Sequence, residues 1–239
     1  MMNLCIDSGN SFMKIAIFEN TTLILFQERV THSQVKQLCE EYPIEQLMIC
    51  DVSNTYDTVV AYLPKHIPIQ KLTYQTPLPI TNLYETPQTL GMDRIAAVLG
   101  AYALYPNQAC LVIDAGSCIT YDFLSAEREY CGGSISLGLQ MRFKALHEFT
   151  AKLPLLTPSV SDFPAQLGKN TEQAIKSGVI NGLLYEIDAI IASYTQKYGN
   201  VQVLFCGGDA PFLHARVQAK TEVHNLLLLQ GLHQVLLGT

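Results

Sequence analysis

The feature that most constrains the fold of this chain is a short segment that occurs twice. The first copy begins at Met1 and reads MMNLCIDSGNSFMKIAIF, and the second begins at Ala109 and reads ACLVIDAGSCITYDF. Each copy runs through apolar residues into Ile-Asp-small-Gly, turns on small polar residues and leaves through apolar residues again. Apolar runs bounded by such turns are typical of buried strands. The repeat therefore predicts two strand–turn–strand units in a weakly duplicated chain.

The rest of the sequence extends this pattern in both halves. In the first half we expect strands over 3–7, 13–18, 22–27 and 46–51, helices over 32–41 and 91–105, and a largely irregular proline-bearing segment over 64–90. In the second half we expect strands over 110–115, 120–124, 131–136, 201–206 and near 222, and helices over 139–149, 171–197, 210–218 and 225–237. This order predicts an α/β fold of two duplicated lobes, residues 1–107 and 108–239, with a central cleft onto which both turns face.

Composition narrows the class of protein. Of the 239 residues 49% are hydrophobic, which is enough for a sizeable core, and the net charge of -6 without a Lys/Arg cluster disfavours a nucleic-acid partner. The seven cysteines form no CxxC pair and have no matching His pair, which argues against a zinc site and fits a reducing cytoplasm. Asp7 and Gly9 interrupt the N-terminal segment before a signal peptide could form, and NLLLLQGLHQVLL is too short to cross a bilayer. We therefore expect a soluble cytoplasmic protein without a membrane partner.

The two acidic turns suggest nucleotide chemistry. We call residues 7–11 the first acidic turn and residues 114–117 the second acidic turn. Turns of small residues expose backbone N–H groups that suit an anion, and a carboxylate beside phosphates requires a cation between them. Facing Asp7 and Asp114 therefore suggest a metal-bound polyphosphate, most simply Mg-ATP. Further donors are Asn10, Ser11, Ser117, Thr120 and, with a positive charge, Lys14. Either turn alone would be read as ordinary Asp-x-Gly turn chemistry, and the second copy favours function.

Two other segments carry candidate chemistry. TLGMDRIAAVLGAY places Asp93 and Arg94 in the first turn of a predicted helix. They fit a general base beside a cationic anchor, although the helix dipole alone also favours an Asp there. LFCGGDAPF is a strand–turn–helix segment whose paired glycines would let a phosphate or a flat ring approach, or would simply make a tight connection.

Taken together these segments resemble the type III pantothenate kinases, which belong to the actin-like, sugar-kinase and Hsp70 ATPase superfamily with ribonuclease H-like lobes. The resemblance covers nearly the whole chain, and its motifs occur in the family's order. The matching residues are DSGNS at 7–11, Tyr84-Glu85, GMDR at 91–94, DAGS at 114–117 with Thr120, GGSI at 132–135 with Gly138, GKNT at 168–171 with Gly178, and GGD at 207–209.

The resemblance implies ATP-dependent phosphorylation of pantothenate, the first committed step toward coenzyme A, with Asp93 as base. Pantothenate would be bound by Tyr84, Gly91, Met92, Asp93 and Arg94. ATP would be bound by Asp7, Ser8, Gly9, Asn10, Ser11, Phe12, Met13, Lys14 and Ser117. Asp114 would lie beside a monovalent cation, K+ or NH4+, which the family needs beside Mg2+. Family members are homodimers with a shared active site, and Thr171 would reach the substrate from the partner subunit; from the residues alone, Asn170 or Thr171 is only a helix cap.

Several residues depart from the family pattern. Ser11 and Ser117 replace threonines, Cys118 replaces an alanine, Leu137 replaces a proline, and Met92 replaces a smaller residue. None of these changes removes a charged catalytic group.

Two alternative functions stay open. The first is another phosphotransferase or phosphohydrolase on the same fold, which would turn over ATP or polyphosphate without pantothenate. The second is a nucleotide-binding regulator, which would bind ATP without turnover.

Overall fold

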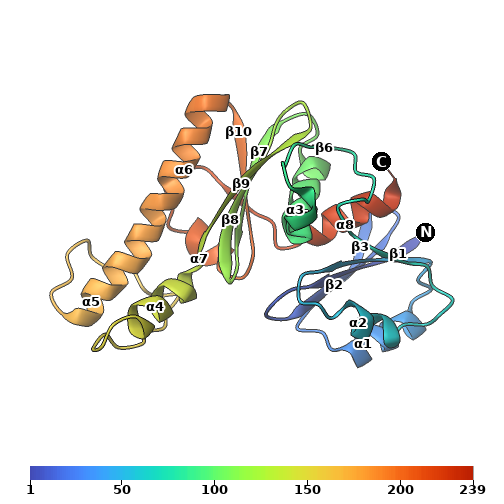
Figure 1. Cartoon of the computed structure of the whole chain (residues 1–239), viewed down its shortest axis with the longest axis horizontal. Coiled ribbons are helices and arrows are strands. Elements are labelled where there is room, and N and C mark those ends of the chain that lie inside the picture. Colours follow the sequence, from blue (N-terminus) through green and yellow to red (C-terminus); the bar gives the residue numbers. More distant parts are fainter. Residues whose placement is uncertain (239) are drawn as a thin grey trace. The chain divides into compact units, whose positions relative to one another are not determined.

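The computed structural model describes residues 1–238, and these form two compact units (Figure 1). The first unit contains residues 1–108, residues 123–132 and the C-terminal segment from Leu226, and the second contains residues 109–122 and 133–225. Along the sequence, the first unit gives way to the second between residues 108 and 109. This is one residue beyond the expected boundary between residues 107 and 108. The division into lobes 1–107 and 108–239 stays a prediction, and the C-terminal segment groups with the first unit.

The first unit is built on a five-stranded sheet with the order β3-β2-β1-β4-β5. Its strands are β1 (Met2–Ser8), β2 (Met13–Glu19), β3 (Thr22–Glu28), β4 (Gln46–Asp51) and β5 (Ile69–Lys71). β2 runs antiparallel to β1 and β3, whereas β4 is parallel to both β1 and β5. Because β1 and β4 are parallel, their carboxyl ends share one sheet edge, where Ser8 lies opposite Asp51. The expected strands of this half are confirmed to within one residue at either end.

Helices cover both faces of this sheet. On one face, α1 (His32–Glu41) and α2 (Tyr56–Ala61) contribute Val35 and Val59 to a core shared with Leu4 and Ile6 of β1. On the other face, α8 (Leu227–Leu237) contacts β1 and packs against α3 (Met92–Leu104). The two helices approach closely because each carries a glycine at the contact: an added Cβ at Gly100 or Gly231 would collide with the backbone of the other helix.

The second unit contains most of a six-stranded sheet. The second sheet has the order β11-β10-β7-β8-β9-β6, with β7 (Ala109–Ala115), β8 (Cys118–Leu124), β9 (Glu129–Leu137), β10 (Val201–Cys206) and β11 (Glu222–Val223). The short β6 (Thr81–Asn82) pairs with residues 129–130 of β9, which belong to the first unit. β10 is parallel to β7 and to β11. The parallel register sets Cys206 opposite Asp114, so the turns that follow β7 and β10 are neighbours.

The second unit has four α-helices along the described residues: α4 (Leu139–Glu148), α5 (Thr171–Lys176), α6 (Gly182–Tyr198) and α7 (Ala210–His214). Ile180, Leu183 and Ile187 pack on the sheet, in one core with Ile113 and Phe205. The short 3-10 helix η1 (Pro87–Thr89) lies in the expected proline-bearing segment of the first unit. Along residues 1–238 no helix is both long and apolar enough to cross a membrane.

Two helix predictions were wrong in extent. The expected single helix over 171–197 is divided by a π-helical segment, Ser177–Asn181 (η2). Ser177 and Asn181 there donate side-chain hydrogen bonds to the carbonyl groups of Gln166 and Pro164, in the preceding loop. The helix expected over 210–218 ends at His214, because the backbone N–H groups of residues 218 and 219 instead donate to the Asp188 carboxylate.

Candidate active site

The first acidic turn joins β1 to β2 and exposes its tip. Asn10 and Ser11 are exposed, whereas Ser8 is only 4% exposed and Met13 is buried in the core. The Ser8 hydroxyl lies 2.6 Å from that of Thr55 and 3.0 Å from that of Ser53. The tip therefore offers neutral donors to a ligand, while the side chain of Ser8 is engaged by the protein.

The predicted cation of this turn, Lys14, is already paired. Lys14 lies opposite Asp7 on β1 and opposite Glu28 on β3, and its Nζ is 3.2 Å from Glu28 Oε1. Lys14 and Arg29 both lie over the Phe12 ring, with Lys14 Nζ 5.4 Å and the Arg29 guanidinium carbon 4.6 Å from the ring centre. Sequence reasoning missed Arg29, since a single arginine at the end of a predicted strand carries no signal. The role of Lys14 toward a phosphate stays a prediction.

Asp93 lies in the first turn of α3, where its Oδ1 accepts the backbone N–H of Arg94 at 2.9 Å. An added Cβ at Gly91 would collide with this oxygen, so glycine at 91 makes room for the carboxylate. Burial raises the pKa of the Cys50 thiol well above its ordinary value, and the charges of Asp7 and Asp93 raise it further. Cys50 lies opposite Asp7 in the register of β1 and β4, and Asp93 belongs to the same unit.

Two of the predicted pantothenate residues, Tyr84 and Arg94, are in contact with one another. Arg94 is buried, and its guanidinium carbon lies 5.7 Å from the centre of the Tyr84 ring. Tyr84 also stacks on Tyr130 at 6.3 Å between ring centres. Gly132, at φ +94°, lies under the Tyr84 ring, where an added Cβ would be 3.6 Å from Cδ2. A cavity of about 150 Å³ lies beside Met92; its lining also includes Thr73, Tyr74, Thr76, Leu78, Ile80, Asn82 and Ile95.

Backbone contacts fix the second acidic turn. Gly207 has φ +91°, and an added Cβ there would collide with the Asp114 carboxylate and the Ala115 carbonyl. The Asp209 N–H donates to the same Ala115 carbonyl at 2.9 Å. Gly138 presses in the same way against the carbonyl groups of residues 116 and 117, while Ser117 itself is exposed. The GGD segment and Gly138 therefore support this turn, and its tip stays open.

Arg142 and Glu186 support the strand–helix connection that carries Gly138, and sequence reasoning missed both. Arg142 donates to the Leu137 carbonyl at 2.8 Å and to Glu186 at 2.6 Å, and the Tyr121 hydroxyl donates to the other Glu186 oxygen at 3.0 Å. Burial alone would raise the pKa of Glu186, but hydrogen bonds from Arg142, Ser136 and Tyr121 lower it below its ordinary value. Leu137 replaces the proline of the family pattern, and the Arg142 hydrogen bond constrains the backbone at that position.

Thr171 is the exposed first residue of α5. The cap of this helix is Asn170, whose Oδ1 accepts the Gln173 N–H at 2.9 Å, so the alternative of Thr171 as cap was wrong. Gly168 packs against the first turn of α5, where an added Cβ would collide with the Ala174 backbone. The Thr171 side chain therefore stands at the surface of the second unit, on a segment that Gly168 and Asn170 fix.

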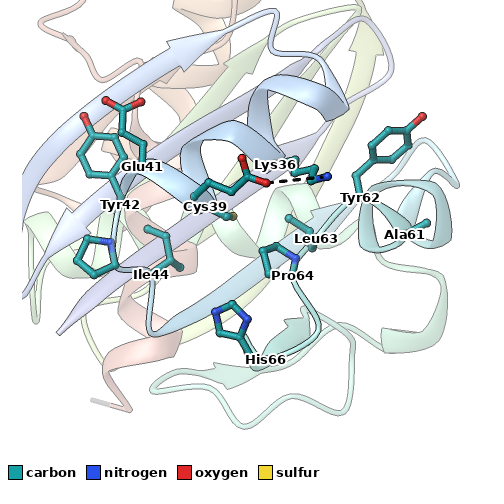
Figure 2. Close-up of a pocket in the computed structure, with 12 residues that line it drawn as sticks. Lys36, Cys39, Glu41, Tyr42, Ile44, Ala61, Tyr62, Leu63, Pro64 and His66 are labelled. Carbon is teal, nitrogen blue, oxygen red and sulfur yellow. Dashed lines mark ion pairs between the residues drawn. The ribbon is translucent and has the colours of Figure 1, made fainter.

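A second cavity lies on the first unit (Figure 2). It has a volume of about 780 Å³ and is lined by α1 and by residues 42–44, 61–64 and 66, with Lys36 paired to Glu40 at 3.9 Å. Residues 42–44 precede β4, whereas Asp7 and Asp51 are at the carboxyl ends of β1 and β4. The cavity therefore lies near the amino end of β4, whereas the first acidic turn follows the carboxyl end of β1.

Comparison with solved structures identifies the fold. A Baf-family transcriptional activator of Campylobacter jejuni, so described, superposes with a TM-score of 0.63 at 22% identity, covering 98% of each chain. The activator of the 2-hydroxyisocaproyl-CoA dehydratase from Clostridium difficile, solved with bound ADPNP, gives a TM-score of 0.52 at 11% identity, covering 98% of this chain and 94% of the other. The fold is that of the actin-like ATPases and sugar kinases.

Sequence comparison then identifies the family. The family model for type III pantothenate kinase matches residues 3–193. The type III pantothenate kinase of Bacteroides fragilis is 40% identical over 238 residues, covering 98% of this chain and 97% of the relative. That of Phocaeicola vulgatus is 42% identical over 240 residues, covering 98% of each. The chain belongs to the type III pantothenate kinase family.

Proposed function

We propose that this chain transfers the γ-phosphoryl group of ATP to pantothenate, giving 4'-phosphopantothenate for coenzyme A biosynthesis in the cytoplasm. The observation that carries the proposal is the geometry of the GMDR motif in a chain of this family. Gly91 leaves room for the Asp93 carboxylate, and Arg94 is buried against Tyr84. A generic ATPase of this fold has no need of that combination.

In this mechanism Asp93 orients the primary hydroxyl of pantothenate and accepts its proton as the oxygen bonds to the γ-phosphorus and ADP leaves. Phosphoryl transfer is loose, so the hydroxyl loses its proton late and an ordinary carboxylate suffices as base. The N–H of Arg94 fixes one oxygen of Asp93. The Arg94 guanidinium and Tyr84 hold the substrate, whose carboxylate can pair with the guanidinium through charge-assisted hydrogen bonds.

We assign the two acidic turns to ATP. Their exposed tips present hydroxyl and amide donors, among them Asn10, Ser11 and Ser117. Among residues 1–238 no group of three or more His, Cys, Asp or Glu side chains could by itself hold a metal ion. That fits Mg2+, which binds through one or two carboxylates plus substrate phosphates and neutralises their charge. In the first unit Asp7 would supply a carboxylate for Mg2+, and in the second unit Asp114 would lie beside the monovalent cation.

We further propose a homodimer in which Thr171 contributes to the site of the partner subunit. The second unit exposes large apolar side chains before α5, including Val160 (84%), Phe163 (72%) and Leu167 (81%), and Phe149 (85%) at the end of α4. Arg216 holds this segment through the Val160 carbonyl and stacks on Phe163. A fixed apolar surface next to Thr171 suits a second copy of this chain.

A coupled assay of ADP release tests the proposal directly. The purified chain with Mg-ATP should release ADP only when pantothenate is added, and faster when K+ is present. ADP release that ignores pantothenate would transfer the function to another phosphotransferase or phosphohydrolase of this fold. ATP binding without any turnover would instead support a regulator.

A further inference from the structure

Asp51 lies at the end of β4, outside every motif that identified the family, yet its carboxylate is completely inaccessible to solvent. It accepts the backbone N–H groups of Ser53 at 3.2 Å, Thr55 at 3.1 Å and Tyr56 at 3.1 Å. The ammonium group of Lys71 lies 3.4 Å from Oδ2 and also over the Tyr56 ring. A buried carboxylate with this many donors is a fixed part of the structure.

The same carboxylate organises three hydroxyl groups. Ser53 Oγ and Thr55 Oγ1 lie 3.2 Å and 3.4 Å from Asp51 Oδ1, and 2.9 Å from one another. Ser8 Oγ completes the cluster at 3.0 Å from Ser53 and 2.6 Å from Thr55. Ser8 therefore connects this cluster to the first acidic turn, whose carboxylate, Asp7, is the preceding residue.

Ser53 and Thr55 lie within hydrogen-bond distance of both Asp51 and Ser8. An ionised carboxylate only accepts, so any hydroxyl hydrogen bond to Asp51 is donated by Ser53 or Thr55. In the contacts among Ser8, Ser53 and Thr55 either hydroxyl can be the donor, and the shortest of them joins Ser8 to Thr55 at 2.6 Å. The hydroxyl of Ser8, a residue only 4% exposed, is therefore engaged by the protein.

We propose that Asp51 is a positioning residue for ATP: through Ser53 and Thr55 it holds Ser8, and with it the first acidic turn, in the geometry that binds the nucleotide. This inference rests on the proposed function, because that function assigns the first acidic turn to ATP. The Ser8 carbonyl also accepts the Val52 N–H at 3.2 Å, so the turn is tied to this loop by backbone and side chain. Ser8 therefore connects the first acidic turn to the loop of Val52, Ser53 and Thr55, and its side chain is not a phosphate ligand.

The charge of Asp51 matters because an ionised carboxylate accepts from every donor around it. Burial alone would raise the pKa of this carboxyl, but hydrogen bonds from Thr55, Tyr56, Ser53 and Lys71 lower it below its ordinary value. An asparagine has the same shape but replaces one acceptor oxygen by an NH2 donor. That NH2 would face N–H and hydroxyl donors, which would loosen the loop of Ser53 and Thr55 that holds Ser8.

The test compares Asp51→Asn and Ser8→Ala with Asp57→Asn, a matched control on the exposed side of α2. We expect the KM for ATP to rise about tenfold in Asp51→Asn and Ser8→Ala, with the KM for pantothenate within about twofold and the control unchanged. The double variant should be no worse than Ser8→Ala, because both act through one contact. A KM for ATP that stays at the wild-type value in Ser8→Ala would overturn the proposal.

Melting temperature and nucleotide binding separate the possible failures. If Asp51→Asn lowers the melting temperature but leaves the KM for ATP unchanged, Asp51 only stabilises the fold and the proposal is wrong. The Kd of Mg-ATP, measured by calorimetry on the whole chain, gives the same comparison without turnover. If the wild-type chain bound Mg-ATP but did not phosphorylate pantothenate, the proposed reaction would fail, and a rise in Kd for both variants would still support the role of Asp51.

Discussion

Replacing Gly91 by alanine tests whether the position of the Asp93 carboxylate determines the rate. Gly91 has φ −60° and ψ 124°, a conformation that any residue adopts, so the change adds no backbone strain. The added methyl group would nevertheless collide with Asp93 Oδ1, which would have to move by about 1 Å to reach ordinary contact. The substitution therefore displaces the candidate base while the backbone keeps its conformation.

The expected effects on rate and stability differ in size. A misplacement of about 1 Å costs about 100-fold in rate, or about 2.7 kcal/mol of activation free energy. Gly91 is the N-cap of α3, where alanine should destabilise the folded protein by about 1 kcal/mol at most relative to glycine. Alanine also lowers the conformational entropy of the unfolded chain, which stabilises the folded protein by about 0.4–1 kcal/mol. The free energy of unfolding should therefore change by less than about 1 kcal/mol.

The assay is pantothenate-dependent ADP release at saturating substrates, with a melting curve for each variant. Gly182→Ala is the control, because an added Cβ at Gly182 meets no atom within 4 Å and its kcat should not change. Adding Gly91→Ala to Asp93→Asn should slow the enzyme no further, since both act through one carboxylate. A folded Gly91→Ala variant with wild-type kcat would refute the reasoning.

Three further predictions concern the cation, the second acidic turn and pH. Asp114→Asn should weaken the dependence of the rate on K+, and an unchanged K+ titration would contradict the cation assignment. Gly207→Ala should lower the free energy of unfolding by more than about 3 kcal/mol, because it adds a collision with Asp114 to a positive φ. Gly199→Ala, with φ +77° and no neighbour within 4 Å, should cost only the backbone part, about 1–3 kcal/mol, in denaturant titrations. Burial lowers the pKa of His233 below 6.5 despite its contact with the Asn20 carbonyl, so the unfolded chain takes up a proton first and stability should fall as the pH drops through about 6.5. His233→Gln should flatten this fall in urea titrations between pH 7 and 5; a wild-type slope in the variant would assign it to other groups.

Local pattern predicted most elements of this fold. The apolar runs of β1, β4, β7 and β10 are long enough to be read directly, and α1 was predicted with the bounds it has. Elements that depend on distant contacts were less accessible. The π-helical segment within 171–198 depends on hydrogen bonds to residues 164 and 166, and no periodicity within the helix reveals them.

The candidate site shows the same division. The motif residues could be predicted because each stands in a short run of characteristic residues, as Asp93 does in GMDR. Asp51 could not, because its importance arises from the parallel pairing of β1 with β4, which sets it opposite Ser8 across more than forty positions of sequence. Lys14 shows the converse: its charge was visible in the sequence, but its partner Glu28 was not.

The duplicated turns are alike in sequence but are supported by different chemistry. The first depends on side-chain hydrogen bonds that link Asp51 through Ser53 and Thr55 to Ser8, and an added Cβ at Gly9 would make only a 3.4 Å contact. The second depends on backbone packing, in which Gly138 and Gly207 leave no room for a Cβ. A change of charge without a change of shape should therefore loosen the first turn, whereas a single added methyl group should disrupt the second. The repeat explains why both turns exist, and the surroundings of each determine how it is held.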